Sequence, residues 1–272
     1  MKLTIFTTCR PFEGEFADIQ RNAVTSWALL KPEPQIILIG AEMGTAELAK
    51  DMRLKYLPSV QRNIWDTPLL SSLFWSAITC GTGDVLCYVN SDIILLDDFM
   101  PAVEACARKF SGAWLLTGPR WDVPVEGQLN IEEDWRGSIR KTLKEHGKRH
   151  KPTGLDYFVF PRGTFEPASF PPLAVGRTAW DAWLVWKARS KRVPTIDGSM
   201  SITAVHQMHE KGGKPEEKKT NQAMASSDRL GRGYIWEGKY RVVPGPGRKL
   251  IVQSAPDAAV LWSANTGWED WE

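Results

Sequence analysis

The sequence lacks several features that would place it in a specialised class. It has no uninterrupted apolar stretch of the ~20 residues needed to cross a membrane. Its first ten residues, MKLTIFTTCR, begin a strand-like pattern without the basic start and apolar core of a signal peptide. The formal net charge is only +2, so no general attraction to nucleic acid or membranes is indicated.

Cysteine is also scarce. The four cysteines (Cys9, Cys80, Cys87 and Cys106) are scattered and show no CxxC spacing. This pattern favours reduced thiols in the core and argues against a disulfide framework or a structural zinc site. Together with the missing leader and span, it leads us to expect a cytoplasmic protein.

What the sequence does contain is an alternation of strand and helix patterns over its first 120 residues. Its length of 272 residues and its 43% hydrophobic content suffice for one large domain with appendages. Such alternation predicts an α/β fold with a parallel sheet. Strands are expected at 3–8, 35–40, 55–57, 85–89 and 114–118, and helices at 16–30, 45–52, 68–79 and 100–110.

After residue 120 the pattern is less regular. A basic helix is expected at 135–150, where a solvated face is favoured over an acceptor-binding patch. His146 and His150 lie in this segment and are taken as bystanders. A further helix is expected at 177–188. Residues 207–233 are polar and rich in Lys, Gly and Ser, which predicts a mobile segment.

The most informative stretch is Cys87–Leu96, an apolar run interrupted by Asn90, Ser91 and Asp92. Burying an unpaired carboxylate is costly, so a polar insert at the end of a buried strand points to a ligand. Ligands of open α/β sheets bind beyond the carboxyl ends of strands. On extended backbone Asn90 and Asp92 would face the same side and offer oxygens to a divalent cation that grips a diphosphate. A plain strand-end turn is an equally good interpretation of these three residues.

The order and spacing of several segments resemble those of nucleotide-sugar-dependent glycosyltransferases of the GT-A fold. The resemblance covers about residues 1–210. It is carried by LTIFTTCRPF, DIQRNAVTSWALL, IILIG, VQRNIWDTPLL, YVNSDIILLDDF, GLDYFVFPR, PPLAVGRTAWDAWL and AVHQMHE. It implies a Rossmann-like, mostly parallel sheet flanked by helices in a catalytic domain at 1–210, with a nucleotide-sugar part at 1–120 and an acceptor-side part at 121–210. A mobile segment at 211–233 and a C-terminal extension at 234–272 would follow.

The resemblance also assigns a metal site. Asn90-Ser91-Asp92 stands where these enzymes carry an Asp-x-Asp motif, so Asp92 is the expected ligand of Mn²⁺ or Mg²⁺ and Asn90 is a departure from the motif. A late histidine often completes that site, and His206 follows the apolar run 202–205, with His209 as a substitute. The residues that the resemblance places around the nucleotide are Thr7, Thr8, Arg10, Arg62, Asn63, Thr67, Asn90 and Ser91.

On the acceptor side, the resemblance implies a carboxylate near a helix start that takes the proton of the attacking hydroxyl. Asp181 is the candidate, with a plain helix N-terminal Asp as the alternative. Asp156, among apolar residues, is the second candidate. Trp180, Trp183 and Arg177 are weaker acceptor-binding candidates, with packing as the default for the two tryptophans.

These expectations describe a metal-dependent transfer of a sugar, with UDP favoured as the nucleotide, to a hydroxyl acceptor. The acceptor is a glycan or another hydroxyl-bearing molecule, with a polyanion such as nucleic acid left open by the basic helix. A nucleotidyltransferase is a weaker alternative, since no Gly-rich, Lys-bearing phosphate loop follows the first strand. A non-catalytic sugar-binding module is the other, and it has no need of a metal that grips a diphosphate.

Overall fold

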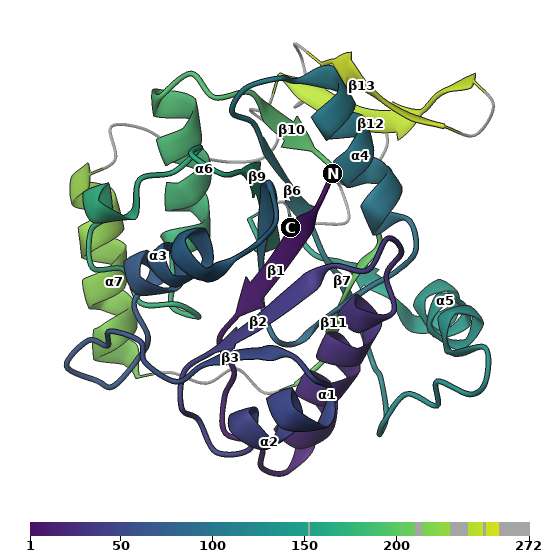
Figure 1. The fold of residues 1–272 in the computed structure, drawn as a ribbon, viewed down its shortest axis with the longest axis horizontal. Helices are drawn as coiled ribbons and strands as arrows, with labels where there is room; N and C mark the ends of the chain where they lie inside the picture. The colour runs from purple at the N-terminus through teal and green to yellow at the C-terminus, as the bar shows by residue number, and fades with distance from the viewer. Residues whose placement is uncertain (152, 210–213, 229–238, 247–248, 256–272) are drawn as a thin grey trace.

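A large mixed sheet forms the centre of the molecule. The structure is a computed structural model, and it describes residues 1–151, 153–209, 214–228, 239–246 and 249–255. Within these residues the sheet has nine strands (Figure 1). Their order is β13 (Leu250–Ser254), β12 (Tyr240–Pro244), β10 (Thr195–Asp197), β6 (Leu115–Pro119), β9 (Leu155–Pro161), β4 (Val85–Val89), β1 (Leu3–Thr7), β2 (Gln35–Ile39) and β3 (Lys55–Leu57).

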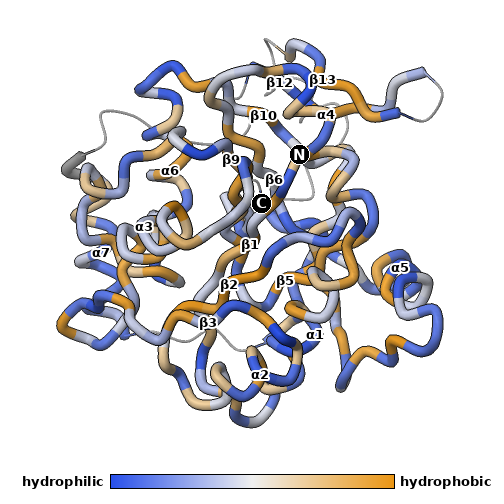
Figure 2. Tube along the Cα trace, in the orientation of Figure 1, coloured by the Kyte–Doolittle hydropathy of each residue, from blue (hydrophilic) through white to orange (hydrophobic). Residues whose placement is uncertain are grey.

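Most neighbouring strands of this sheet run parallel. The exceptions are β9, which is antiparallel to both β4 and β6, and the β12–β13 hairpin. The strands that are buried on both faces are almost wholly apolar, as parallel sheets covered on two sides require. In Figure 2 the hydrophobic residues gather on these central strands, and the hydrophilic ones lie mainly on outer helical turns and loops.

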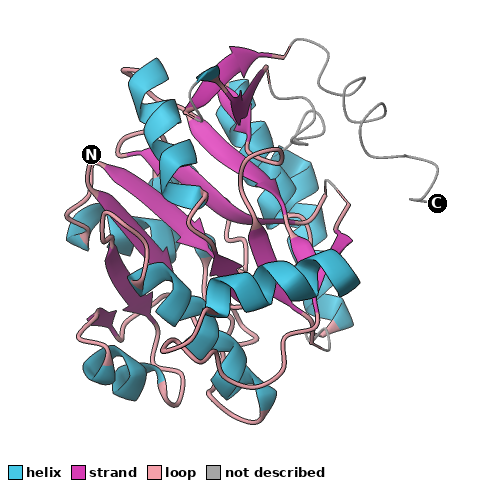
Figure 3. Cartoon of the chain, turned by 90° about the vertical axis from the view of Figure 1, so that its right-hand side faces the viewer, coloured by secondary structure: helices cyan, strands magenta, loops and turns pink. Residues whose placement is uncertain are grey.

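Helices cover both faces of the sheet. One apolar cluster joins α1 (Glu15–Ala28), α2 (Thr45–Asp51) and α4 (Phe99–Lys109) to one face. A second joins α3 (Leu70–Cys80), α6 (Trp180–Ser190) and α7 (Pro215–Asp228) to the other, near the short 3₁₀ turn η1 (Pro167–Ser169). Figure 3 shows the resulting three layers from the side. The fold is therefore of the α/β class that the strand and helix pattern predicts, with helices on both faces of the sheet.

A second, smaller sheet lies beside the carboxyl end of β4. Its strand order is β5 (Ile93–Leu95), β11 (Ala204–Gln207), β7 (Trp121–Val123) and β8 (Lys148–Arg149). The amphipathic helix α5 (Trp135–His146) packs on it through Trp135 and Ile139. This sheet brings together segments that are far apart in the chain.

Most helix boundaries differ from the sequence prediction by one or more residues, and three of the differences bear on the site. α5 ends at His146, because the chain turns at Gly147 into β8, so His150 lies outside the helix. α3 begins at Leu70 because Pro68 and Leu69 are bridged to Arg62 and Ala174 instead. α6 begins at Trp180, three residues later than predicted.

The polar segment 211–233 contains a helix that the sequence does not predict. α7 contributes a buried Ala225 to the core and buries the polar side chains of Glu217 and Asn221. Asn221 accepts a hydrogen bond from the Ala174 backbone N–H and donates one to the Thr178 carbonyl. The polar composition of this segment does not predict a helix, because the inward side of α7 is held by hydrogen bonds more than by apolar contacts. The sequence also predicts mobility for residues 211–213 and 229–233, which lie outside the described residues. Trp262, Trp268 and Trp271 of the C-terminal extension lie outside them too.

Among the residues that the structure describes, no helix is both long and apolar enough to cross a membrane.

Candidate active site

The Asn90–Asp92 turn stands at the junction of the two sheets. Asn90 donates from Nδ2 to Asp156 Oδ1 at 2.6 Å and accepts from the Tyr88 hydroxyl at 2.9 Å. Ser91 donates its hydroxyl to Gln20 Oε1 at 3.0 Å. Both Asn90 and Asp92 line the space at this junction, but the Asn90 side chain is bonded to Asp156 on β9, whereas the Asp92 side chain lies against His206 and His209. The turn interpretation is correct for the backbone, and Asp92 alone of the three faces the histidines.

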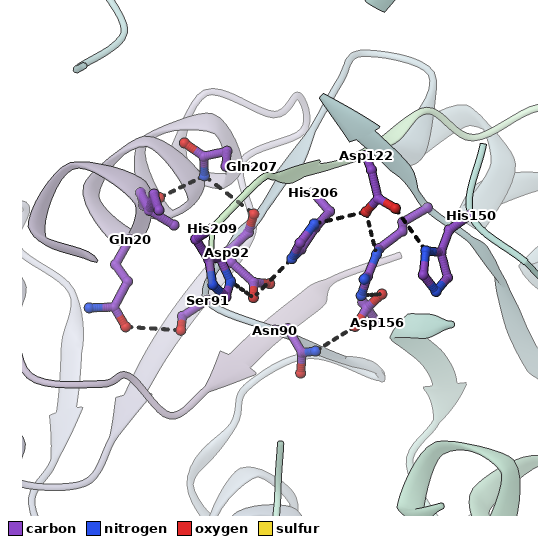
Figure 4. Close-up of polar contacts among 12 residues, drawn as sticks. Gln20, Asn90, Ser91, Asp92, Asp122, His150, Asp156, His206, Gln207 and His209 are labelled. Atoms are coloured by element: carbon purple, nitrogen blue, oxygen red, sulfur yellow. Dashed lines mark hydrogen bonds and ion pairs between the residues drawn. The ribbon is translucent and has the colours of Figure 1, made fainter. Parts of the chain in front are cut away.

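Asp92 lies against two imidazoles. Its Oδ2 atom is 3.2 Å from His209 Nε2 and 3.6 Å from His206 Nε2 (Figure 4). One atom from each of the three side chains falls within 4.8 Å of the others. The second oxygen, Oδ1, is buried and has no hydrogen-bond partner among the residues that the structure describes. Burial raises the pKa of Asp92, but the hydrogen bond with His209 and the charges of His206 and Arg120 outweigh it and hold the pKa below its usual range.

This donor set fits a divalent cation. An orphaned buried carboxylate oxygen is unusual in a native protein and calls for a partner. One carboxylate and two imidazoles form a mixed oxygen and nitrogen donor set of the kind that binds divalent transition-metal cations, and the carboxylate suits Mn²⁺ among them. His209, which sequence analysis ranks second to His206, is an equal member of this cluster.

A second carboxylate, Asp122 on β7, lies behind the first. Its Oδ1 atom is 2.9 Å from His206 Nδ1 and accepts from Arg120 Nε at 2.9 Å. Its Oδ2 atom is 2.7 Å from Nδ1 of His150. Burial raises the pKa of Asp122, but the hydrogen bond with His150, the close contact with His206 and the Arg120 charge bring it far below its usual range.

Asp122 and Arg120 are absent from the site residues predicted from the sequence, and His150 is predicted only as a bystander. His150 is no bystander, because it leaves the helix and lines a cleft beside Asp156. A signal was available in the motif Arg120-Trp-Asp122 at the end of a predicted strand, where polar residues follow an apolar run.

Asp156 on β9 completes the polar chain. Its Oδ2 atom accepts from Arg120 Nη1 at 2.8 Å, and its Oδ1 atom accepts from Asn90. Burial lowers the pKa of Arg120, but Asp156, Asp122 and Asp92 around it raise the pKa above its usual value. The buried Asp156 therefore has the partners that its apolar sequence context demands.

Two adjoining clefts meet at Asp92. We call the first the Thr8 cleft; it has a volume of about 340 Å³. Of the residues predicted to bind a nucleotide, those that line it are Thr8, Arg10, Arg62, Thr67, Asn90 and Ser91. Thr7 does not, because it is fully buried in β1. Asn63 does not either, because its side chain braces the Trp65 and Thr67 backbone and donates to Glu217.

The second, the Asp156 cleft, has a volume of about 530 Å³ and shares Arg10, Asn90, Asp92 and Arg177 with the first. Asp181, Asp156 and Trp180 line it. Burial raises the pKa of Asp181 to about 7, backbone N–H groups such as that of Ala182 oppose the rise, and the charge of Asp156 adds to it. Asp181 therefore has the pKa of an effective proton acceptor near neutral pH.

The two predicted aromatic residues differ in position. Trp180 lines the Asp156 cleft but is 3% exposed and packs against Tyr88 and Phe158. Trp183 is fully buried against Phe170, so it cannot offer a ring face to a ligand. The helical spacing of these two tryptophans therefore reflects packing in the core, which is the default interpretation of the sequence.

Arg177 lies where both clefts meet, and α7 holds it there. Its Nε atom donates to Glu217 Oε2 at 2.5 Å, and its Nη2 atom donates to the Thr67 hydroxyl at 3.1 Å. Burial raises the pKa of Glu217, but hydrogen bonds from Thr67, Asn63 and Arg177 outweigh it, so the pKa lies below its usual value.

Comparison with known proteins gives no match to a family model or to a curated protein sequence. Solved structures do match. Glucosyl-3-phosphoglycerate synthase from Mycobacterium tuberculosis, solved with Mn²⁺, UDP and phosphoglyceric acid, is 14% identical with a TM-score of 0.52, over 96% of this chain and 91% of its own. TarS 1–349 from S. aureus, solved with UDP-GlcNAc, is 14% identical with a TM-score of 0.52, over 84% of this chain and 66% of its own.

The chain has the GT-A fold. The α/β fold class expected from the sequence is thereby confirmed. At this level of identity the comparison speaks for the fold, and the chemistry of the site is argued from the side chains above.

Proposed function

We propose that this protein is a metal-dependent glycosyltransferase that moves a sugar from a nucleotide-diphosphate donor, with UDP favoured, to a hydroxyl acceptor. The observation that carries the proposal is the Asp92–His206–His209 cluster at the point where two polar clefts meet. Transfer between two substrates needs two binding regions and one shared reacting centre. The Mn²⁺ and UDP in the complex of the mycobacterial synthase and the UDP-GlcNAc of the TarS complex support the nucleotide-sugar assignment.

The Thr8 cleft is the candidate donor site. Arg10 and Arg62 line it, and Arg62 is held by an ion pair with Glu42 at 2.6 Å. Guanidinium groups suit phosphate oxygens because their donors form a fixed fork. Asn90 and Ser91 line the cleft next to Asp92, where the sugar diphosphate would lie.

Asp92, His206 and His209 would hold the divalent cation. Bound there, it would neutralise the charge that develops on the departing diphosphate. The protein's own residues bind and orient both substrates around that position.

Asp181 is the candidate base of an inverting reaction. It would accept the proton of the acceptor hydroxyl as that oxygen attacks the anomeric carbon, and its raised pKa suits this role at neutral pH. Asp156 is tied to Arg120 and Asn90, so it is better suited to orienting sugar hydroxyls than to taking a proton.

The products formed from UDP-sugars with Mn²⁺ test this function. A glycosyltransferase releases UDP and free sugar slowly without acceptor. A nucleotidyltransferase would release UMP and a sugar phosphate, and a binding module would release nothing. We expect Asp92→Asn to lower Mn²⁺-dependent UDP release at least about a hundredfold, the scale of one lost transition-state interaction, while the thermal midpoint of the unliganded protein changes little.

The matched control is Asp97→Asn, a surface carboxylate five residues on whose side chain is 64% exposed and pairs with Arg140. It should keep wild-type UDP release. Unchanged Mn²⁺ dependence in Asp92→Asn would contradict the metal assignment, and UMP as the product would contradict the transfer chemistry.

A further inference from the structure

One carboxylate, that of Asp122, contacts two histidines of the site at once. Its Oδ1 atom faces His206 Nδ1 and its Oδ2 atom faces His150 Nδ1, as Figure 4 shows. Arg120 Nε donates to the Oδ1 atom at 2.9 Å. Each oxygen therefore has a defined partner, and the carboxylate cannot rotate without losing contacts on both sides.

The small sheet fixes this arrangement by strand register. Ile93, His206, Asp122 and Lys148 are opposite one another across β5, β11, β7 and β8. Asp92 precedes the first of these residues and His150 lies two residues beyond the last. The backbone ladder thus sets the spacing between the carboxylate, the two imidazoles and Asp92 before any ligand binds.

The contact with Asp122 decides which nitrogen of His206 is available. A neutral imidazole carries one proton, and both nitrogens of His206 face a carboxylate. Nδ1 lies 2.9 Å from Asp122 Oδ1, closer than Nε2 lies to Asp92 Oδ2, so Nδ1 is the nitrogen that keeps the proton. With the proton on Nδ1, the lone pair of Nε2 points to Asp92, 3.6 Å away. A metal-binding histidine commonly has its second nitrogen fixed in this way.

His150 is held by the same carboxylate and by a neighbouring glycine. A Cβ atom at Gly154 would lie 2.1 Å from His150 Cδ2, so the ring occupies space that only a glycine leaves open. Its Nδ1 atom faces Asp122, and the ring borders the Asp156 cleft.

We propose that Asp122 is a positioning residue that holds His206 with Nε2 toward the cation site and His150 with Nε2 toward the Asp156 cleft. The first half rests on the proposed function, because it presumes a cation at Asp92. Asp122 acts through the two imidazoles and touches neither substrate nor cation. If Asp122 served only as the counter-charge of Arg120, replacing it would change neither the position of the proton on each imidazole nor the affinity for Mn²⁺.

Nitrogen-15 NMR of the metal-free wild type tests the tautomers directly. The chain has only four histidines, so labelled histidine gives few signals, and the spectrum of His206→Ala assigns the one that it lacks. The pH is raised until the signals stop changing, so that the neutral rings are observed. We expect Nδ1 to carry the proton in both His206 and His150. A proton on Nε2 of His206 would overturn the proposal.

Mn²⁺ affinity, measured by calorimetry, tests the consequence. Asp122→Leu has a similar shape but no acceptor, so it should weaken Mn²⁺ binding about 10–100-fold, the usual effect of losing such a partner. Asp122→Asn can keep its carbonyl oxygen toward His206 and turn its NH₂ group toward His150. It should therefore retain Mn²⁺ affinity within about threefold while the His150 proton moves to Nε2. Asp97→Asn is the charge-matched control and should match the wild type.

A double-mutant cycle separates positioning from general damage. In a His206→Ala background, Asp122→Leu should cause no further loss of Mn²⁺ affinity, because the residue through which it acts is gone. Additive losses would overturn the proposal. If Asp122→Leu does not fold, Asp122→Asn decides instead. A loss of Mn²⁺ affinity in Asp122→Asn as large as that in His206→Ala would also overturn the proposal. A wild type that binds no Mn²⁺ would instead refute the proposed metal site, which is a different result from a wild type that binds Mn²⁺ but is indifferent to Asp122.

Discussion

At the scale of single residues, the two carboxylates Asp156 and Asp181 share a cleft but have different surroundings. Asp156 is neutralised by Arg120 and accepts a hydrogen bond from Asn90. Burial raises the pKa of Asp181 to about 7, since its backbone N–H donors offset the burial only in part and the charge of Asp156 adds repulsion. Neighbouring carboxyl groups whose surroundings differ in this way commonly take different roles in catalysis.

The proposed role of Asp181 as the base predicts how turnover depends on pH. A base must be ionised, so kcat/KM should fall about tenfold per pH unit below pH ~7 and reach a plateau above it. Asp181→Asn should lower turnover at least about a hundredfold and remove this limb. A folded variant that keeps more than about a tenth of wild-type turnover would exclude Asp181 as the base and favour a retaining reaction.

The same group gives a stability signature with a definite sign. Because its pKa is higher in the folded state than the usual 3.8, the folded state binds the proton more tightly. Its contribution to stability is complete below pH ~4 and is lost as the pH rises through about 7. Asp181→Asn should therefore gain stability relative to the wild type between pH 5 and pH 8, measured by urea unfolding, whereas Asp97→Asn should show no such trend.

The sequence predicts those site residues that follow an apolar strand-like run. It does not predict those whose position in the site depends on the pairing of strands. Asp92 and His206 each stand at the end of an apolar run, which marks them as polar residues held by the scaffold. Asp122 belongs to a strand of three residues and His150 directly follows a strand of two, and both strands are too short to leave a periodic pattern. Their meeting is set by the register of the small sheet, which a single sequence does not reveal.

At the scale of elements, α7 connects the segment before α3 with the segment before α6, and both segments line the clefts. Glu217 is 2% exposed and accepts hydrogen bonds from Asn63 in the segment before α3 and from Arg177 in the segment before α6. Helix α7 is mostly polar, and its place in the fold depends on these bonds and on those of Asn221. For this reason hydrophobic periodicity alone did not predict it.

Replacing Glu217 should loosen both loops. Glu217→Gln leaves Arg177 without its counter-charge and should cost about 1.5–3 kcal/mol of unfolding free energy, the scale of hydrogen bonds to charged groups. Because the folded pKa of Glu217 is depressed, this stability is present above the usual carboxyl pKa and is lost as the pH falls through the folded value. The difference from the wild type should therefore be full at pH 7 and shrink in acid.

Glu216→Gln is the matched control, since Glu216 is the exposed neighbour on the same helix. It should change the unfolding free energy by less than about 0.5 kcal/mol, as surface substitutions usually do. The donor affinity of Glu217→Gln should also fall, because Thr67 and Arg177 line the Thr8 cleft. Equal stability of the two variants would show that α7 is not held through Glu217.

At the scale of the whole molecule, the alternation of strands and helices in the first 120 residues predicted the parallel half of the sheet. It did not predict that β9 inserts antiparallel between β4 and β6, or that β12 and β13 extend the sheet beyond β10. Those pairings join residues that are far apart in the chain, and their local patterns are short. The insertion matters for the site, because it sets Asp156 beside Asn90.

The same long-range construction means that a bound donor should stabilise the whole fold. The two clefts are lined by residues from Thr8 in the segment after β1 to Gln222 in α7, so unfolding of either side of the sheet destroys the site. A ligand that binds only the folded state adds about 2.7 kcal/mol at a hundredfold excess over its dissociation constant. For a chain of this size that amounts to a rise of roughly 5–10 °C in the thermal midpoint.

UDP with Mn²⁺ should produce this rise in the wild type and in Asp97→Asn, whereas UDP with a chelator should produce a smaller one. In Asp92→Asn the difference between Mn²⁺ and chelator should disappear, because the increment due to the cation depends on that carboxylate. An equal rise with and without Mn²⁺ in the wild type would mean that the nucleotide binds without the cation, and the cluster at Asp92 would then have no part in holding the donor.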